Sequence, residues 1–171
     1  MLDDQQVRES GLPLGLPVGY RFKPTDLELV TYYLSNKVNF MPLPAQVVHE
    51  IDARELYSKD PRSFVESSLF CGDREWFFFI RKDGNFNGNF SDKTNRTVKV
   101  GDGIGFWRTL GEKIPIRNSS GHVFAFKINF TYYSGGKKTQ WQMDVYQLEG
   151  EVCFHVSLSS VDFYKHSQIS K

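Results

Sequence analysis

Basic residues gather in one part of this chain, where they could bind a polyanion. The 171 residues carry a net charge of +1, but the segment from Lys93 to Met143 holds nine Lys and Arg residues against only Asp102 and Glu112. Its surplus of seven positive charges is offset by a surplus of six negative charges over the rest of the chain. Charge segregated in this way is typical of a nucleic-acid binder. The competing interpretation is a solvated sheet face that happens to be basic.

Residue types that serve catalysis or metal binding form no recognisable motif. The four histidines are scattered, at His49, His122, His155 and His166, and no nucleophile-elbow, His-Glu-x-x-His or P-loop pattern occurs. The Gly101-x-Gly103-x-Gly105 run lacks the strand–loop–helix unit of a nucleotide site. The two cysteines lack metal-ligand spacing. We therefore expect no enzymatic activity, no metal, no cofactor and no small-molecule substrate.

The composition indicates one intracellular domain. A hydrophobic content of 40%, with 15 Phe and 8 Tyr, is ample for a core. Cys71 and Cys153 are too few for a disulfide framework and fit buried thiols in a reducing compartment. No apolar run approaches the roughly 20 residues of a membrane span, and the acidic N-terminus does not resemble a signal peptide. We expect a frayed tail over residues 1–11, a domain over 12–158 and a short tail over 159–171.

The clearest local signal is a helix start at Thr25. Pro24 disfavours helical angles at Lys23, and Thr25 with Glu28 forms a Thr-x-x-Glu capping box. The helix should run over about residues 26–38, with one apolar stripe made of Leu27, Val30, Leu34 and Val38. A second short helix is expected over residues 52–57, while residues 60–68 are ambiguous.

From Glu75 onward the hydrophobic period is that of strands. The unbroken apolar run Trp76–Ile80 fits a strand buried on both faces, and a loop is expected around Gly135-Gly136. Further strands are predicted over residues 97–100, 122–130, 141–145 and 152–158. Consecutive strands with short connections indicate an antiparallel sheet, and because the helices come early the class is α+β.

Four blocks of the sequence, in order, resemble the DNA-binding domain of plant NAC transcription factors. They are Leu16–Val30, Glu75–Phe79, Gly105–Gly111 and Gln140–Leu148. The resemblance implies a twisted antiparallel β-sheet flanked by a few short helices, with no metal. It also implies a nuclear, sequence-specific transcription factor that binds duplex DNA in the major groove as a homodimer, or as a heterodimer with other NAC proteins.

The resemblance places Trp107-Arg108-Thr109-Leu110-Gly111 on a strand edge that enters the major groove. A cation there can read guanine acceptors or bind phosphate, and a glycine permits close backbone approach. The bland interpretation is a core aromatic at Trp107 beside a surface charge at Arg108. Lys137 and Lys138, in a loop after two glycines, are either phosphate ligands or a polar hairpin tip. The candidate DNA-binding residues are Arg96, Lys99, Arg108, Thr109, Leu110, Gly111, Lys113, Lys137 and Lys138.

Some of these positions depart from the family's pattern. Thr109 and Leu110 stand where the family has Ala-Thr, Val100 replaces an arginine, and Glu112 would repel phosphate. These departures leave the base preference open. Together with the near-neutral net charge, they favour the alternative function, a NAC-fold dimerisation and protein-interaction module with weakened or lost DNA binding.

The resemblance also implies a dimer interface near the first helix. Arg21 and Glu28 occupy positions through which NAC domains pair across a two-fold axis, and Leu16 contributes to a short intersubunit ribbon. In an isologous interface one basic and one acidic residue supply two symmetric ion pairs. Glu28 as a capping acid alone is the competing interpretation, although the two roles are compatible.

Overall fold

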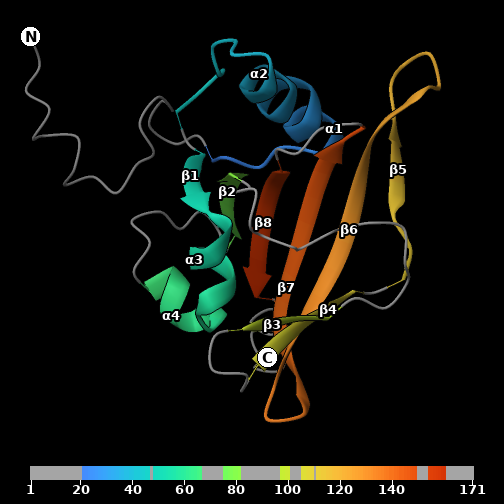
Figure 1. Cartoon of the computed structure of the whole chain (residues 1–171). Helices are drawn as coiled ribbons and strands as arrows, with labels where there is room; N and C mark the ends of the chain where they lie inside the picture. The colour runs from blue at the N-terminus through green and yellow to red at the C-terminus, as the bar shows by residue number, and fades with distance from the viewer. Residues whose placement is uncertain are drawn as a thin grey trace, which may run out of the picture.

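One sheet organises the chain. The computed structural model describes residues 21–46, 48–66, 75–81, 97–100, 105–109, 111–149 and 154–160. Within these ranges the strands run in the order β1-β2-β8-β7-β6-β4-β3, and β5 pairs with β6 outside this path (Figure 1). The strands are β1 (His49–Asp52), β2 (Glu75–Arg81), β3 (Thr97–Val100), β4 (Gly105–Thr109), β5 (Ile114–Arg117), β6 (Val123–Ser134), β7 (Lys137–Leu148) and β8 (Phe154–Ser160).

The described helices are short and come before most of the sheet. They are α1 (Asp26–Glu28), a π-helical segment η1 (Leu29–Leu34), α2 (Ser35–Val38), α3 (Ala53–Ser58) and α4 (Pro61–Glu66). The predicted α+β class is therefore confirmed, and the ambiguous residues 60–68 include a helix. None of the helices in the described ranges has the length and apolar character needed to cross a membrane.

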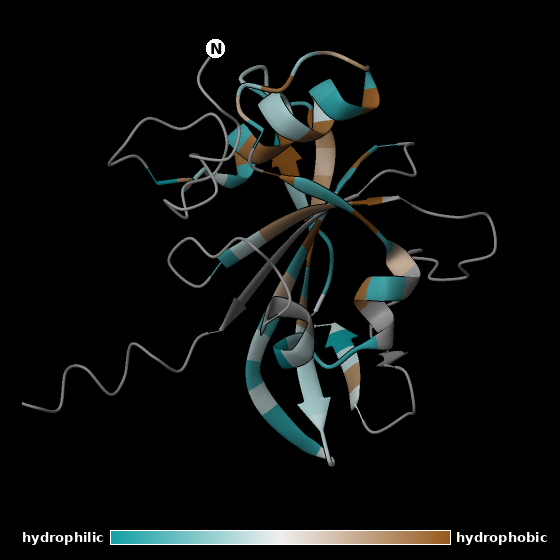
Figure 2. Cartoon of the chain, turned by 90° about the vertical axis from the view of Figure 1, so that its left-hand side faces the viewer, coloured by the Kyte–Doolittle hydropathy of each residue, from teal (hydrophilic) through white to brown (hydrophobic). Residues whose placement is uncertain are grey.

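The strand pairs are antiparallel except at one margin of the sheet. β1 pairs with β2 in parallel, because α3 and α4 carry the chain between them and return it to the same end. The predicted antiparallel sheet is corrected at this pair only. The last strand ends at Ser160, two residues past the predicted strand end at Leu158. Figure 2, turned by 90°, shows the strands fanning out below the N-terminal helix, as a strong twist requires.

The β2 strand divides the core into two layers. Trp76, Phe78 and Ile80 pack in a cluster with Ala53 and Leu56 of α3. The alternate residues of β2, Phe77 and Phe79, pack in a second cluster with the N-terminal helix and with Tyr146 and Leu148 of β7. Side chains alternate across a strand, so the two clusters lie on opposite faces of the sheet. The prediction of a strand buried on both faces is confirmed.

The N-terminal helix begins as its sequence predicts. The Thr25 backbone N–H donates to the Glu28 carboxylate at 2.8 Å, and the Glu28 N–H donates to the Thr25 hydroxyl at 3.2 Å. This reciprocal pair is the capping box. It satisfies two backbone donors that a helix start otherwise leaves without partners.

The predicted apolar stripe of this helix is wrong at one residue. Leu27 is 45% exposed, whereas Leu29, Val30, Tyr33 and Leu34 are buried. The cause is the π-helical segment, in which the Ser35 N–H bonds to the Val30 carbonyl five residues back. Such a turn takes in more residues than the 3.6 of an α-turn, so the buried face rotates away from Leu27.

Candidate nucleic-acid interface

One face of the sheet carries the N-terminal helix at one end and basic residues at the other. Strand register places Phe106 opposite Tyr133, and Tyr133 opposite Lys138. The neighbouring row places Arg108 opposite Thr131. These residues share the face opposite Trp107, which belongs to the α3 cluster. We call Phe106, Arg108, Tyr133 and Lys138, with the adjoining Lys137, the basic end of the sheet. Lys137 lies opposite Ser134, so alternation along β7 places it on the other face at the hairpin end.

Trp107 anchors the strand that presents Arg108. Its side chain is only 1% exposed and its ring lies 5.2 Å from that of Tyr132. A Cβ atom at Gly105 would overlap the Tyr132 hydroxyl, so a glycine is needed for this close approach. The core interpretation of Trp107 is confirmed. Because neighbouring side chains alternate, a buried Trp107 leaves Arg108 on the other face, where it is exposed.

The predicted strand edge is wrong for most of this block. β4 lies between β3 and β6, because Thr97–Val100 pairs with Gly105–Arg108 on its outer side. Among the described residues, the β3 pairing reaches Arg108 opposite Thr97, and Thr109 lies opposite Phe130 of β6. Among the described strands β3 forms the margin of the sheet.

The residues that follow Arg108 differ in their exposure to solvent. Thr109 is 7% exposed, because it shares the buried face of Trp107, and its side chain is not available to a base. Leu110 lies outside the described residues. Gly111 is exposed with a φ of 84°, a conformation that glycine adopts at little cost. Glu112 is exposed beside it.

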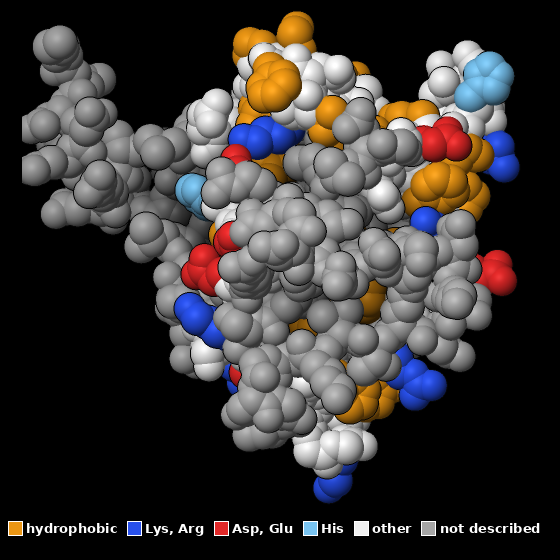
Figure 3. Space-filling model, viewed as in Figure 1, with side chains coloured by type: hydrophobic (Ala, Val, Ile, Leu, Met, Phe, Trp, Pro, Cys, Tyr) orange, Lys and Arg blue, Asp and Glu red, His pale blue; other side chains and the backbone are white. Residues whose placement is uncertain are grey.

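Lys137 and Lys138 lie at the tip of a tight hairpin, and the predicted loop is confined to the two glycines before them. Gly135 and Gly136, with φ values of 57° and 74°, form the two-residue turn, and β7 begins directly at Lys137. Two successive positive φ values are the hallmark of a narrow hairpin turn. Both lysines are exposed. Blue side chains mark this tip at the bottom of Figure 3, where Figure 1 draws the end of the β6–β7 hairpin.

For the other predicted cations, the structure gives less support for a place at the basic end. Lys113 is half-buried, with its ammonium 5.4 Å from the centre of the Phe126 ring. The Lys99 backbone lies in β3 opposite Phe106. Arg96 lies outside the described residues.

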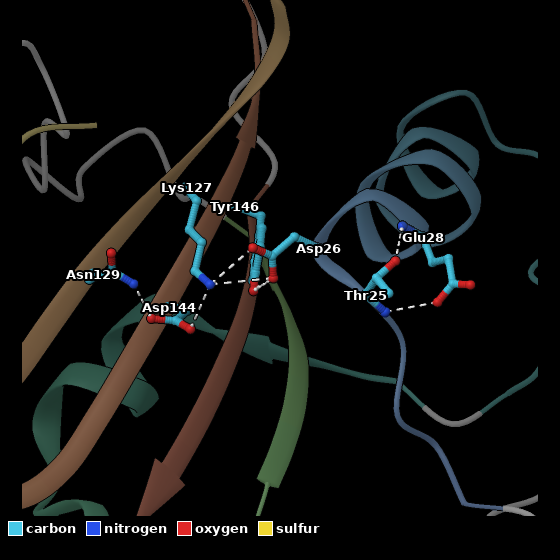
Figure 4. A network of polar contacts seen from close by, with 7 residues as sticks. All are labelled: Thr25, Asp26, Glu28, Lys127, Asn129, Asp144 and Tyr146. Carbon is cyan, nitrogen blue, oxygen red and sulfur yellow. Dashed lines mark hydrogen bonds and ion pairs between the residues drawn. The ribbon is translucent and has the colours of Figure 1, made fainter. Parts of the chain in front are cut away.

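Lys127 belongs to the basic segment of the sequence but is neutralised inside the fold (Figure 4). Its ammonium lies 3.0 Å from Asp26 and 3.2 Å from Asp144, and its side chain is 18% exposed. The Tyr146 hydroxyl donates to Asp26 at 2.7 Å, and the Asn129 amide donates to Asp144 at 2.5 Å. This group, which we call the Asp26–Lys127 network, ties the start of the N-terminal helix to β6 and β7.

Electrostatics in the Asp26–Lys127 network favour the charged lysine. Burial opposes the ammonium, but the carboxylates of Asp144 and Asp26 outweigh that cost and raise the pKa of Lys127. Burial, and then the hydrogen bond to Asp26, raise the pKa of the Tyr146 hydroxyl. Sequence reasoning missed the network because Lys127 and Asp26 are 101 residues apart.

The residues predicted to form a dimer lie on the N-terminal segment. Arg21 and Glu28 are both exposed, and the Glu28 carboxylate accepts the Thr25 N–H within the capping box. Leu16 lies outside the described residues. In the described part of the chain, no three His, Cys, Asp or Glu residues gather closely enough to hold a metal ion.

Comparison with known proteins gives consistent matches. The family model described as No apical meristem (NAM) protein matches residues 17–148. NAC domain-containing protein 68 of Oryza sativa subsp. japonica is 38% identical over 147 residues, which cover 82% of this chain and 43% of that protein. NAC transcription factor 32 of Arabidopsis thaliana is 37% identical over 145 residues, covering 82% of this chain and 52% of that protein.

A longer match covers more of the chain. NAC domain-containing protein 86 of Arabidopsis thaliana is 33% identical over 167 residues, covering 93% of this chain and 32% of that protein. The chain thus spans between 32% and 52% of the length of these three relatives.

Proposed function

The chain belongs to the No apical meristem (NAC) family of plant proteins, and on this premise we propose that it is a sequence-specific duplex-DNA-binding domain acting in transcription. The observation that carries the proposal is the basic end of the sheet. There Arg108 is exposed on a strand whose neighbouring residue, Trp107, is fixed in the core. A rigid strand that presents a guanidinium is suited to reading base edges in the major groove.

In this proposal the residues of the block divide their roles. The Arg108 side chain accepts base or phosphate contact, and Gly111 allows the backbone to come close to the DNA. Thr109 contributes through its backbone only, since its side chain is buried. Leu110 remains a candidate for contact with a thymine methyl group.

The lysines supply the binding energy that does not depend on sequence. Lys137 and Lys138 project from a narrow hairpin, and phosphate contact by exposed cations positions a protein without specifying the bases. We assign the same role to Arg96, Lys99 and Lys113. Lys127 is left out, because Asp26 and Asp144 already neutralise it.

We further propose that the domain acts as a dimer in the nucleus. Arg21 of one protomer would pair with Glu28 of the other across a two-fold axis, and Leu16 would lie in the adjoining ribbon. Homodimers and heterodimers with other NAC proteins are both compatible with such a self-complementary patch.

A NAC-fold interaction module with weak DNA binding is the second candidate. The neutralisation of Lys127 by two carboxylates and the exposed carboxylate of Glu112 favour it. DNA binding and this alternative make opposite predictions for an arginine substitution at the basic end.

The test compares Arg108→Ala with Arg117→Ala on a selected duplex and on random DNA. Arg108→Ala should cost about 1 to 3 kcal/mol on the selected site and narrow the gap to random DNA, since base contacts specify. Arg117 is the matched control, an exposed arginine on β5 whose guanidinium donates to the Gly121 carbonyl at 2.9 Å. Affinities are measured by fluorescence anisotropy at one fixed salt concentration.

An equal decrease in affinity on both duplexes would make Arg108 a phosphate ligand, and specificity would pass to Leu110 or to the backbone at Gly111. No measurable binding by the unsubstituted chain would leave the interaction module as the function.

A further inference from the structure

The β6–β7 hairpin does not continue the sheet ladder straight. Thr131 lies opposite Gln142, whereas Tyr133 lies opposite Lys138, so two steps along β6 match four steps along β7. The extra residues form an irregularity in the register between Thr131 and Tyr133. A bulge of this kind bends its strand and increases the local twist, which re-aims the side chains beyond it.

One side chain holds this bulge together. The Thr139 hydroxyl donates to the Tyr132 carbonyl at 2.8 Å and accepts the Trp141 N–H at 3.2 Å. Both partners belong to core residues, since Tyr132 and Trp141 are 2% and 6% exposed. The hydroxyl therefore replaces ladder hydrogen bonds that the bulge interrupts, and it fixes the bend relative to the core.

A second contact fixes the hairpin relative to the strand that carries Arg108. The rings of Phe106 on β4 and Tyr133 on β6 stack with centroids 5.2 Å apart and planes at 3°. Tyr133 is also the residue opposite Lys138. The hairpin tip is thus joined to β4 on one side and to the Thr139 bulge on the other.

We propose that Thr139 is a positioning residue for DNA binding. Its hydroxyl, together with the Phe106–Tyr133 stack, sets the bend of the hairpin so that Lys137 and Lys138 reach phosphates beside the groove that Arg108 enters. Thr139 itself touches no DNA in this arrangement. The inference rests on the proposed function. It adds the residue that sets the distance between Arg108, which contacts the bases, and Lys137 and Lys138, which contact the phosphates.

The experiment uses two substitutions of the same residue in the full chain. Thr139→Val keeps the shape but removes the hydroxyl, whereas Thr139→Ser keeps the hydroxyl. We expect Thr139→Val to reduce the slope of log affinity against log salt by about 0.9 for each phosphate that the lysines no longer reach, as Lys137→Ala/Lys138→Ala does. Thr139→Ser should retain the slope of the unsubstituted chain. Circular dichroism and thermal melting verify that each variant is folded.

A double-mutant cycle then shows whether Thr139 acts through the lysines. On the Lys137→Ala/Lys138→Ala background, adding Thr139→Val should change neither slope nor affinity further. A second, independent drop would overturn the proposal, as would a folded Thr139→Val variant that binds like the unsubstituted chain. If Thr139→Val fails to fold, Phe106→Leu takes its place in the cycle, with the same expected result and the same contrary one.

The outcomes also separate this inference from the proposed function. If the lysine substitutions lower the slope but Thr139→Val and Phe106→Leu do not, DNA binding stands and the positioning role is refuted. If the unsubstituted chain binds no duplex at low salt, both fall.

Discussion

Tyr146 and Lys127 show how single residues join distant parts of this chain. Both contact Asp26, the first residue of the N-terminal helix, from strands more than a hundred residues later. A half-buried ion pair with further hydrogen bonds is costly to break from one side, because a charge is then left without its partner. The start of the helix is therefore held to the sheet by polar contacts as well as by the capping box.

Removing the Tyr146 hydroxyl should destabilise the fold. Tyr146→Phe takes a donor from the Asp26 carboxylate, and a hydrogen bond to a charged group contributes about 1.5 to 3 kcal/mol. We expect a decrease of that size in the free energy of unfolding, measured by urea denaturation near neutral pH. Tyr32→Phe is the control, because Tyr32 is 55% exposed on η1 and should cost little.

This decrease should depend on pH in a defined direction. The folded-state pKa of Tyr146 lies above its ordinary value of 10.0, so its contribution is fully present below that value. As the pH rises past it, the unfolded tyrosine ionises first and the contribution disappears. The gap in the free energy of unfolding between Tyr146→Phe and the unsubstituted chain should be constant up to about pH 9 and narrow as the pH rises past 10.0. A gap that widened over this range would contradict the assignment.

For individual residues, much of the candidate site could be predicted from the alternation of side chains along β4. The burial of Trp107 and the exposure of Arg108 were both within reach of the sequence. The burial of Thr109 was equally predictable, since it shares the face of Trp107, but the resemblance drew it into the set of expected contact residues. The neutralisation of Lys127 was not predictable, because its partners Asp26 and Asp144 come close to it only through the pairing and packing of the sheet.

Among the elements, the N-terminal helix shows what local signals can and cannot predict. Thr25 and Glu28 are three residues apart, so the sequence alone identifies the capping box. The π-helical turn over Leu29–Leu34 depends on how the helix packs against β2 and β7, and it moved the buried face away from Leu27. In the same way, β3 was predicted as a strand, but its place outside β4 depends on pairing across the sheet.

The N-terminal helix and the segment before it also carry the predicted dimer interface. Arg21→Glu should weaken self-association, because two symmetric exposed ion pairs contribute up to about 2 kcal/mol in total, or roughly 30-fold in the dissociation constant. The double reversal, Arg21→Glu with Glu28→Lys, should recover part of that affinity. Glu28→Gln is a useful control, since glutamine can still complete the capping box but carries no charge.

Light scattering and sedimentation report these changes directly. A monomeric unsubstituted chain at micromolar concentration would remove the dimer from the proposal. If Glu28 served the helix start alone, Glu28→Lys would lower thermal stability, Glu28→Gln would largely retain it, and neither substitution would change dimerisation.

For the molecule as a whole, the net charge of +1 conceals a division between its two ends. The helix end of one sheet face is held by apolar packing and by the Asp26–Lys127 network, which uses two carboxylates for one lysine. The opposite end presents Arg108, Lys137 and Lys138 to solvent. A fold that separates charge in this way can bind a polyanion at one end while its total charge stays near zero.

The central claim is that this basic end binds duplex DNA, and salt dependence tests it most directly. Each subunit offers up to six candidate cations, Arg96, Lys99, Arg108, Lys113, Lys137 and Lys138. If a dimer neutralises roughly 6 to 10 phosphates with them, its affinity for a duplex should fall about 10³- to 10⁵-fold between about 50 and 200 mM salt. A flat salt profile, or no binding at about 50 mM salt, would contradict the claim.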